Sequence, residues 1–312
     1  MEKSPSQNGL RAQAARRIAV LLLTDGQDFQ RFQGQSAADA CARNGLSLEL
    51  AYADNNPFVQ IRQVLEFIER PLNTRPAVIA IETASAPVGF NQAARAALAA
   101  GVGWIELSSG ASIVETLRFD YPGQIVASVA ADEEAIGMLQ AQQCAVLLPT
   151  GGAILYVEGP TTNAVVSARR VALEKGLRKL SISITKTLAA DWTEEGAKMA
   201  AIAWLQQASA SRVRPDLICS QNDAMAMGVR SAASSLRVAW ANIPMLGCDG
   251  VPSVGQRYVN EGLLSATVIK PATAGPAVEW MARKLRGENP PLHVVLQPES
   301  YPKVEAIGRH RQ

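Results

Sequence analysis

The sequence contains little of several residue types, and each scarcity excludes a class of function. Only two histidines occur in 312 residues, His293 and His310. Two histidines cannot form a histidine-rich metal site or an HExxH helix. Neither has a serine or cysteine partner nearby in the sequence, which argues against histidine-based nucleophilic catalysis. No metal site or cofactor is therefore expected.

Cysteine is also scarce, and its spacing carries no redox or metal motif. Cys41, Cys144, Cys219 and Cys248 form no CxxC pair. Three of them lie in or beside apolar runs, where a free thiol packs as a small hydrophobic side chain. We interpret the four as buried structural thiols.

Net charge and long apolar runs are absent as well. The chain has 30 Lys and Arg against 28 Asp and Glu, so no overall field attracts nucleic acid or an anionic membrane. The most suggestive apolar stretch, Ile18–Leu23, has six residues, far below the roughly 20 that span a bilayer. Arg16-Arg17 precedes it without the apolar region of a secretion signal. Free thiols and no signal favour a cytosolic protein.

What is present is an alternation of short apolar runs and longer amphipathic ones. Hydrophobic residues make up 48% of the chain and aromatics only 5%, which favours thin layers of helix and sheet over a β-sandwich. Residues 1–16 are polar and are expected to form a mobile tail, too short for a DNA-binding module. Ten strands are predicted from residue 17 on: Ile18–Leu23, Ser47–Tyr52, Ala77–Ile81, Gly103–Leu107, Gln124–Ser128, Ala153–Tyr156, Ser181–Thr187, Leu217–Cys219, Pro244–Gly247 and Ser265–Val268.

Helical spacing occurs between these strands. The apolar positions from Val59 to Ile68 share one helix face, and helices are also predicted over Ala130–Leu148 and Glu194–Gln207, the latter capped by Thr193. Ten strands exceed a comfortable single open sheet, and Pro149-Thr-Gly-Gly152 marks a break near the midpoint. The sequence predicts an α/β fold of two lobes, each with a parallel sheet.

Polar segments follow several of the predicted strands. In parallel α/β sheets, ligands bind beyond the carboxyl ends of the strands, where helix N-termini and loop amides converge. The segments are Thr24-Asp-Gly-Gln-Asp-Phe29, Ser108-Ser109-Gly110, Glu158 with Thr161-Thr-Asn-Ala164, Ser220-Gln-Asn-Asp223 and Cys248-Asp-Gly250. We expect the binding residues among them.

Several of these residues also have a purely structural interpretation. Asn222 can cap the helix that follows it, and Asp249-Gly250 can form a turn. Arg169 and Arg170 can form a solvated basic face, Trp192 can be a hydrophobic staple, and Lys270 can point to solvent. The residues alone leave both interpretations open.

The order of these motifs resembles the type I periplasmic binding proteins for sugars, whose ribose-binding members share the lobes of LacI-type repressors. The resemblance covers residues 17 to about 305. It rests on Ile218-Cys-Ser-Gln-Asn-Asp-Ala-Met-Ala-Met-Gly228, on Met245-Leu-Gly-Cys-Asp-Gly250 followed by Gly262-Leu-Leu-Ser-Ala-Thr267, on Asp54-Asn-Asn56 and on Ser167-Ala-Arg-Arg170.

The resemblance implies two Rossmann-like lobes joined by a hinge of three chain crossings, near 130–132, 270–271 and 292–296. The N-terminal lobe would hold residues 17–131 and 271–292, and the C-terminal lobe residues 132–270 and 293–312. It implies a non-catalytic, monomeric solute-binding protein that closes on a small sugar-like ligand and serves an ABC transporter or sensor. It also implies a periplasmic location, against the cytosolic indication above.

The residues that the resemblance assigns to the ligand come from both lobes. Arg170 matches the family's ligand-binding arginine, with Arg169 as the alternative register. Trp192 and Phe29 match two aromatics that face a sugar ring. The full expected set is Asp28, Phe29, Ser108, Ser109, Arg170, Trp192, Asn222, Asp249 and Lys270.

The chain also departs from the family pattern. Ser108-Ser109 replaces an Asp-Arg pair, Lys270 occupies the place of a hinge glutamine, and Gly26 and Asp28 fall where Asn and a second aromatic are expected. Ribose is therefore not the expected ligand. The changes favour a different hydroxyl pattern or an acidic group on the ligand.

Two other functions are weighed against this one. A LacI-type regulator would require an N-terminal helix-turn-helix, which 16 residues cannot hold. A nucleotide-dependent α/β enzyme would require GxGxxG after the first strand or a GxxxxGK[ST] loop. Neither motif occurs, since Gly151-Gly152 precedes a strand instead of following one.

Overall fold

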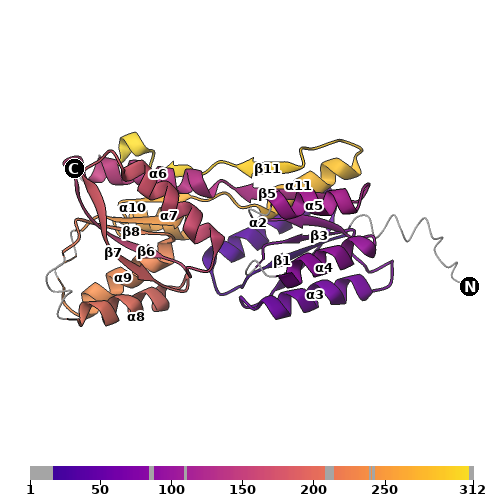
Figure 1. Cartoon of the computed structure of the whole chain (residues 1–312), viewed down its shortest axis with the longest axis horizontal. Helices are drawn as coiled ribbons and strands as arrows, with labels where there is room; N and C mark the ends of the chain where they lie inside the picture. Colours follow the sequence, from indigo (N-terminus) through magenta and orange to yellow (C-terminus); the bar gives the residue numbers. More distant parts are fainter. Residues whose placement is uncertain are drawn as a thin grey trace, which may run out of the picture. The chain divides into compact units, whose positions relative to one another are not determined.

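The protein is described by a computed structural model that covers residues 17–83, 88–108, 111–207, 214–238, 240 and 243–308. The chain forms two compact units. One runs to Ala131 and includes Ala272–Leu296; the other holds Asp132–Pro271 and the chain from Gln297 on. The predicted tail 1–16, Ser109 and His310 lie outside the described residues. Figure 1 shows helices over both faces of the sheet in each unit.

The first unit contains a parallel sheet of six strands in the order β11-β5-β4-β3-β1-β2. Its strands are β1 (Arg17–Leu22), β2 (Ser47–Tyr52), β3 (Val78–Ile81), β4 (Gly103–Glu106), β5 (Val126–Ala131) and β11 (His293–Leu296). Its helices are α2 (Asp28–Asn44), α3 (Pro57–Glu69), α4 (Val88–Ala99), α5 (Ala111–Asp120) and α11 (Ala274–Leu285).

Alternation along β1 distributes the core of this unit over two layers. Ile18, Val20 and Leu22 pack with α2 and α11, whereas Ala19 and Leu21 pack with α3, α4 and α5. Both sets are fully buried, as expected for a parallel strand covered by helices on both faces.

The second unit has a six-stranded sheet in the order β12-β10-β9-β8-β6-β7. Only β12 is antiparallel to its neighbour among the paired strands. The strands are β6 (Gly152–Glu158), β7 (Ile182–Ala189), β8 (Leu217–Ser220), β9 (Met245–Asp249), β10 (Ala266–Ile269) and β12 (Glu299–Tyr301). The helical segments are α6 (Glu133–Leu147), α7 (Ala164–Leu177), α8 (Glu194–Leu205), α9 (Asp223–Ser235), η2 (Pro252–Gln256), α10 (Arg257–Asn260) and η3 (Val304–Ala306).

The predicted α/β class is confirmed, and all ten predicted strands are present. Some predicted boundaries differ from the structure, and the largest consequence is at the start of α6. The sequence prediction began a helix at Ala130, but Ala130 and Ala131 continue β5 and the helix begins at Glu133. Asp132 caps it, because its Oδ1 accepts a hydrogen bond of 2.9 Å from the Ala135 amide.

The structure also differs from the predicted lobe boundaries. The first unit extends to Leu296 instead of ending at residue 292, because β11 pairs in parallel with β5. Pro271 falls in the second unit instead of the first. Strands β11 and β12 were not predicted. None of the described helices has both the length and the apolar character that a bilayer crossing requires.

Candidate functional site

The candidate site of the second unit is built where its parallel strands end. Strand β6 ends at Glu158, β8 at Ser220 and β9 at Asp249, and Lys270 directly follows β10. These carboxyl ends lie along one edge of the sheet, where ligands of parallel α/β folds bind.

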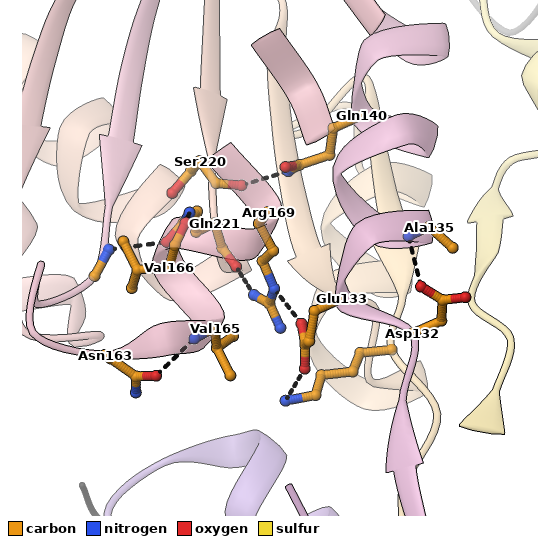
Figure 2. Close-up of polar contacts among 12 residues, drawn as sticks. Asp132, Glu133, Ala135, Gln140, Asn163, Val165, Val166, Arg169, Ser220 and Gln221 are labelled. Carbon is orange, nitrogen blue, oxygen red and sulfur yellow. Dashed lines mark hydrogen bonds and ion pairs between the residues drawn. The ribbon is translucent and has the colours of Figure 1, made fainter. Parts of the chain in front are cut away.

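Arg169 is the central charged group at this edge. Its side chain projects from α7 and is 2% exposed. Its Nε donates to Glu133 Oε2 at 2.6 Å and its Nη1 donates to the Gln221 carbonyl oxygen at 2.8 Å. Figure 2 shows the guanidinium between these two partners. A buried charge held by hydrogen bonds in this way is fixed in direction.

Glu133, the first residue of α6, joins Arg169 to Lys270. Its Oε1 lies 3.5 Å from Lys270 Nζ, and the side chains of Glu133 and Lys270 are only 10% and 12% exposed. Burial raises the pKa of Glu133, but the charges of Arg169 and Lys270 outweigh this, and the net pKa is lowered. The interpretation of Lys270 as a solvent-facing side chain is therefore wrong.

Burial alone would lower the pKa of Arg169. The charge of Glu133 raises this pKa, and Cys248 and Asp249 raise it to a smaller extent. The net pKa of Arg169 is raised. The guanidinium is therefore charged at every pH at which the protein folds.

Arg170, the arginine assigned to the ligand from sequence, has different surroundings. Its Nη1 lies 3.2 Å from Glu158 Oε2 and its Nε lies 3.0 Å from Glu174 Oε1, while its side chain is 39% exposed. Arg169 and Arg170 are neighbours on α7, yet the Arg169 side chain is buried and the Arg170 side chain is partly exposed. The structure brings Arg169, and not Arg170, together with Glu133, Gln221 and Lys270.

Trp192 lies in a tight turn between β7 and α8. Its φ is 71°, a left-handed conformation that costs a non-glycine residue about 1–3 kcal/mol. Three hydrogen bonds hold the turn. Asn222 Nδ2 donates to the Trp192 carbonyl at 2.8 Å, and Asp191 Oδ1 accepts from Thr193 Oγ1 at 2.6 Å and from the Thr193 amide at 3.1 Å. The backbone that carries the indole ring is therefore held on both sides of Trp192.

The faces of the Trp192 ring have close neighbours. The Arg169 Cζ lies 5.9 Å from the ring centroid, within the range of a cation–π contact. A Cβ atom at Gly159 would come within 2.2 Å of the ring, so only glycine fits there. Part of the ring is packed against the apolar core of the second unit.

Asn222 is the helix cap that its sequence position suggested. Its Oδ1 accepts a hydrogen bond of 2.8 Å from the Met225 amide, and its Nδ2 binds the Trp192 carbonyl. The side chain is thus a link between the start of α9 and the Trp192 turn. Whether it also contacts a ligand stays a prediction.

Replacing Asn222 by alanine should lower the free energy of unfolding by about 1–2 kcal/mol, because the cap and the Trp192 contact are lost together. Asn222→Asp keeps the cap acceptor but lacks the Nδ2 donor, so its loss should be smaller. Urea unfolding of both variants measures the difference. Equal losses in both variants would show that the cap contributes nothing.

Asp249 and Asp223 play different parts beside the site. Asp223 is buried and structural: its Oδ2 accepts from the Gly250 amide at 2.8 Å and its Oδ1 accepts from Thr267 Oγ1 at 2.6 Å. Asp249 ends β9 with a φ of 91°. Its charge acts on Arg169, and its contact with a ligand stays a prediction.

Three predicted residues of the first unit, Asp28, Phe29 and Ser108, are described by the structure and follow the carboxyl ends of its strands. Asp28 begins α2 and pairs with Arg31. Phe29 is buried and lies 6.5 Å from Phe32, centroid to centroid. Ser108 follows β4 and donates from Oγ to Glu106 Oε1 at 2.8 Å. Their contact with a ligand stays a prediction.

The four cysteines are all buried, as the sequence analysis predicted. Burial raises the pKa of Cys41 to about 11 and that of Cys248 to about 12. These thiols therefore stay protonated at neutral pH. Within the described ranges, no group of three or more His, Cys, Asp or Glu side chains is arranged to hold a metal ion.

A family model described as a periplasmic binding protein domain matches residues 18–289. No curated protein sequence matches the chain.

Solved structures with the same fold include the Caulobacter myo-inositol-binding protein bound to myo-inositol, with 19% identity, TM-score 0.77 and coverage of 95% of this chain and 96% of that one. An ABC transporter solute-binding protein of Actinobacillus succinogenes with bound D-allose has 20% identity, TM-score 0.78 and coverage of 91% and 96%. The fructose-binding periplasmic domain of a hybrid two-component system has 18% identity, TM-score 0.77 and coverage of 94% and 93%.

The family model spans most of the chain, and the fold of these structures agrees with it. Periplasmic binding proteins bind a solute and do not transform it. The chain therefore belongs to the periplasmic binding protein family, the family that its sequence motifs resemble.

Proposed function

We propose that this protein binds a small polyhydroxylated solute, a sugar or sugar derivative, and delivers it to an ABC transporter or a sensor protein in the membrane. The observation that carries the proposal is the buried, oriented Arg169 beside the Trp192 ring at the strand-end edge of the second unit. Similar structures bind myo-inositol, D-allose and fructose.

In this proposal Arg169 replaces Arg170 as the ligand-binding arginine. A guanidinium donates two parallel hydrogen bonds and so suits vicinal oxygens. The Trp192 ring would pack on the C–H groups of a sugar ring, a contact worth on the order of 1 kcal/mol beyond area burial. The other proposed ligand residues are Asp28, Phe29, Ser108, Ser109, Asn222, Asp249 and Lys270.

Binding residues from both units would make the three chain crossings the points that bend when the ligand binds. The ligand favours the closed state only by its differential contacts with that state. A periplasmic location forms part of the proposal. Free cysteines alone would favour a reducing compartment. Because all four are buried, they can stay unpaired in the periplasm as well.

A thermal-shift screen tests the binding function. The panel is myo-inositol, D-allose, D-fructose, L-arabinose and D-glucuronate. At least one should raise the melting temperature in a saturable way, because a ligand at 100 times its Kd stabilises the native state by about 2.7 kcal/mol. No shift across the panel would contradict the proposed ligand class.

The variant Asp249→Ala tests the site. It should abolish the shift produced by the best ligand of the panel, because the proposed acceptor for ligand hydroxyls is lost. Glu305→Ala, which removes an exposed carboxylate from η3 of the same unit, is the matched control and should retain the full shift. Normal binding by Asp249→Ala would remove Asp249 from the site.

A further inference from the structure

Glu106 is a buried acid in an otherwise apolar strand. It ends β4, in which all four residues are buried, and it is 4% exposed. Its neighbours in register are Ile81 of β3 and Ser128 of β5. An ionisable side chain in such a strand requires hydrogen-bond partners of its own.

Those partners are three neutral donors. Oε1 accepts from Ser108 Oγ at 2.8 Å and from Thr83 Oγ1 at 3.4 Å, and Oε2 accepts from the indole Nε1 of Trp104 at 3.2 Å. Among the described residues, no cation pairs with Glu106. The carboxylate is solvated by hydrogen bonds alone.

The charged groups around Glu106 do not supply a counterion. Glu82, just beyond β3, has the same charge and raises the pKa of Glu106. On the β5 side, Ser128 Oγ lies 2.8 Å from Nδ1 of the exposed His293. Arg95 of α4 pairs with Asp120 of α5.

Burial is the largest influence on Glu106 and raises its pKa to about 7, against the opposing hydrogen bonds from Ser108, Trp104 and Thr83. Both protonation states are therefore populated near neutral pH. The two states place the hydrogen atoms of the cluster differently.

Ser108 has a single hydroxyl hydrogen. When Glu106 is ionised, that hydrogen is directed at Oε1, and only the lone pairs of Ser108 remain for another partner. When Glu106 is protonated, the acid can donate to Ser108, and the serine hydrogen is free to turn away. When Glu106 is ionised, the Ser108 hydroxyl can therefore only accept a hydrogen bond from another partner. When Glu106 is protonated, the hydroxyl can also donate one.

We propose that Glu106 is a positioning residue of the binding site, which holds the Ser108 hydroxyl as a hydrogen-bond acceptor and so selects ligands that present a hydroxyl donor at this point. The inference rests on the proposed function, because it places Ser108 against the ligand. It predicts that solute binding is linked to a proton at Glu106.

The coupling is tested first without any ligand. The indole N–H signal of Trp104, assigned by its absence in Trp104→Phe, should shift with pH with a midpoint near 7, because the indole donates to the titrating carboxylate. Glu106→Gln should lose this transition. Ser108→Ala should raise its midpoint by about half a unit or more, since a donor to the ionised form is lost.

Ser253→Ala, at an exposed serine of the second unit, is the control and should leave the midpoint unchanged. An unaltered midpoint in Ser108→Ala, or a transition that persists in Glu106→Gln, would overturn the proposal. These outcomes do not depend on the identity of the solute.

The second measurement uses myo-inositol, D-allose and D-fructose as probes in calorimetry at pH 6 and pH 8. The best of the three should bind about five-fold more weakly at pH 6, the loss of one fixed hydrogen bond. The ratio of the Kd at pH 6 to the Kd at pH 8 should fall below about two-fold in Glu106→Gln and in Ser108→Ala. An equal ratio in the parent and Glu106→Gln would overturn the proposal.

If none of the probes binds at either pH, the proposed function fails for these polyols, and the Trp104 titration alone decides the role of Glu106.

Discussion

Glu133→Ala is expected to lower the free energy of unfolding by about 3–5 kcal/mol, the cost of leaving buried charges without their partner. The carboxylate binds Arg169 Nε at 2.6 Å and lies 3.5 Å from Lys270 Nζ. Arg169 cannot lose its proton to escape the penalty, because a guanidinium stays charged in proteins. Urea unfolding followed by circular dichroism measures the loss.

Glu134→Ala is the matched control. Glu134 is the next residue of the same helix turn and is exposed, so its replacement should change the free energy of unfolding by no more than about 0.5 kcal/mol. Glu133→Gln keeps an acceptor for Arg169 and should fall between the two. It provides a measurable variant should Glu133→Ala fail to fold. Equal stability of the Glu133→Gln and Glu134→Ala variants would show that the charge of Glu133 is not needed.

The pH dependence of this effect has a definite sign. The pKa of Glu133 is lowered in the folded state, so its contribution is present above the pKa of the unfolded chain and is lost as the pH falls through the folded value. The difference between the parent and Glu133→Gln should therefore shrink under acid conditions.

The second large effect, expected for Glu106, has the opposite sign. Its folded pKa of about 7 lies above the usual glutamate value of 4.5. The folded state therefore binds a proton more tightly than the unfolded chain, and this contribution is fully present below pH 4.5 and lost as the pH rises through 7. Over that window the parent should lose about 3 kcal/mol of stability through this one group.

Glu106→Gln removes the titrating group and keeps the shape of the side chain. The difference in unfolding free energy between Glu106→Gln and the parent should move by about 3 kcal/mol in favour of the variant from pH 5 to pH 8. Unfolding at four pH values measures it. Glu115→Gln, an exposed acid on α5, should show no such trend. A constant difference for Glu106→Gln would mean that the carboxyl titrates normally.

The fold could be predicted from the sequence because its strands are short, apolar and regularly spaced. The first predicted strand, Ile18–Leu23, differs from β1 by one residue at each end. Strand β11 was missed because it is a half-exposed edge strand with alternating burial, close behind Pro290-Pro291. Its partner β5 lies 165 residues earlier at the His293–Ser128 pair, and no local pattern shows such a pairing.

The site was predicted less completely, for two physical reasons. Arg169 and Arg170 are adjacent on a helix, and only the packing of α7 decides which of them is buried. Glu133 resembled an ordinary acid in the first turn of a helix, and its partner Arg169 is 36 residues away. Glu106 could have been found, since a charged residue inside the apolar run Gly103–Leu107 has no purely structural reason to be there.

The pairing of β11 with β5 also affects how the chain is made. A ribosome releases the polypeptide from the N-terminus, at about 5–20 residues each second. The first sheet lacks an edge strand until His293–Leu296 has emerged, and the second lacks one until Glu299–Tyr301 follows. Both sheets are thus completed within a few residues of each other, well after their other strands have been made. Until then the fully buried strand β5 has an open edge, and a chaperone that covers strand edges would find its target there.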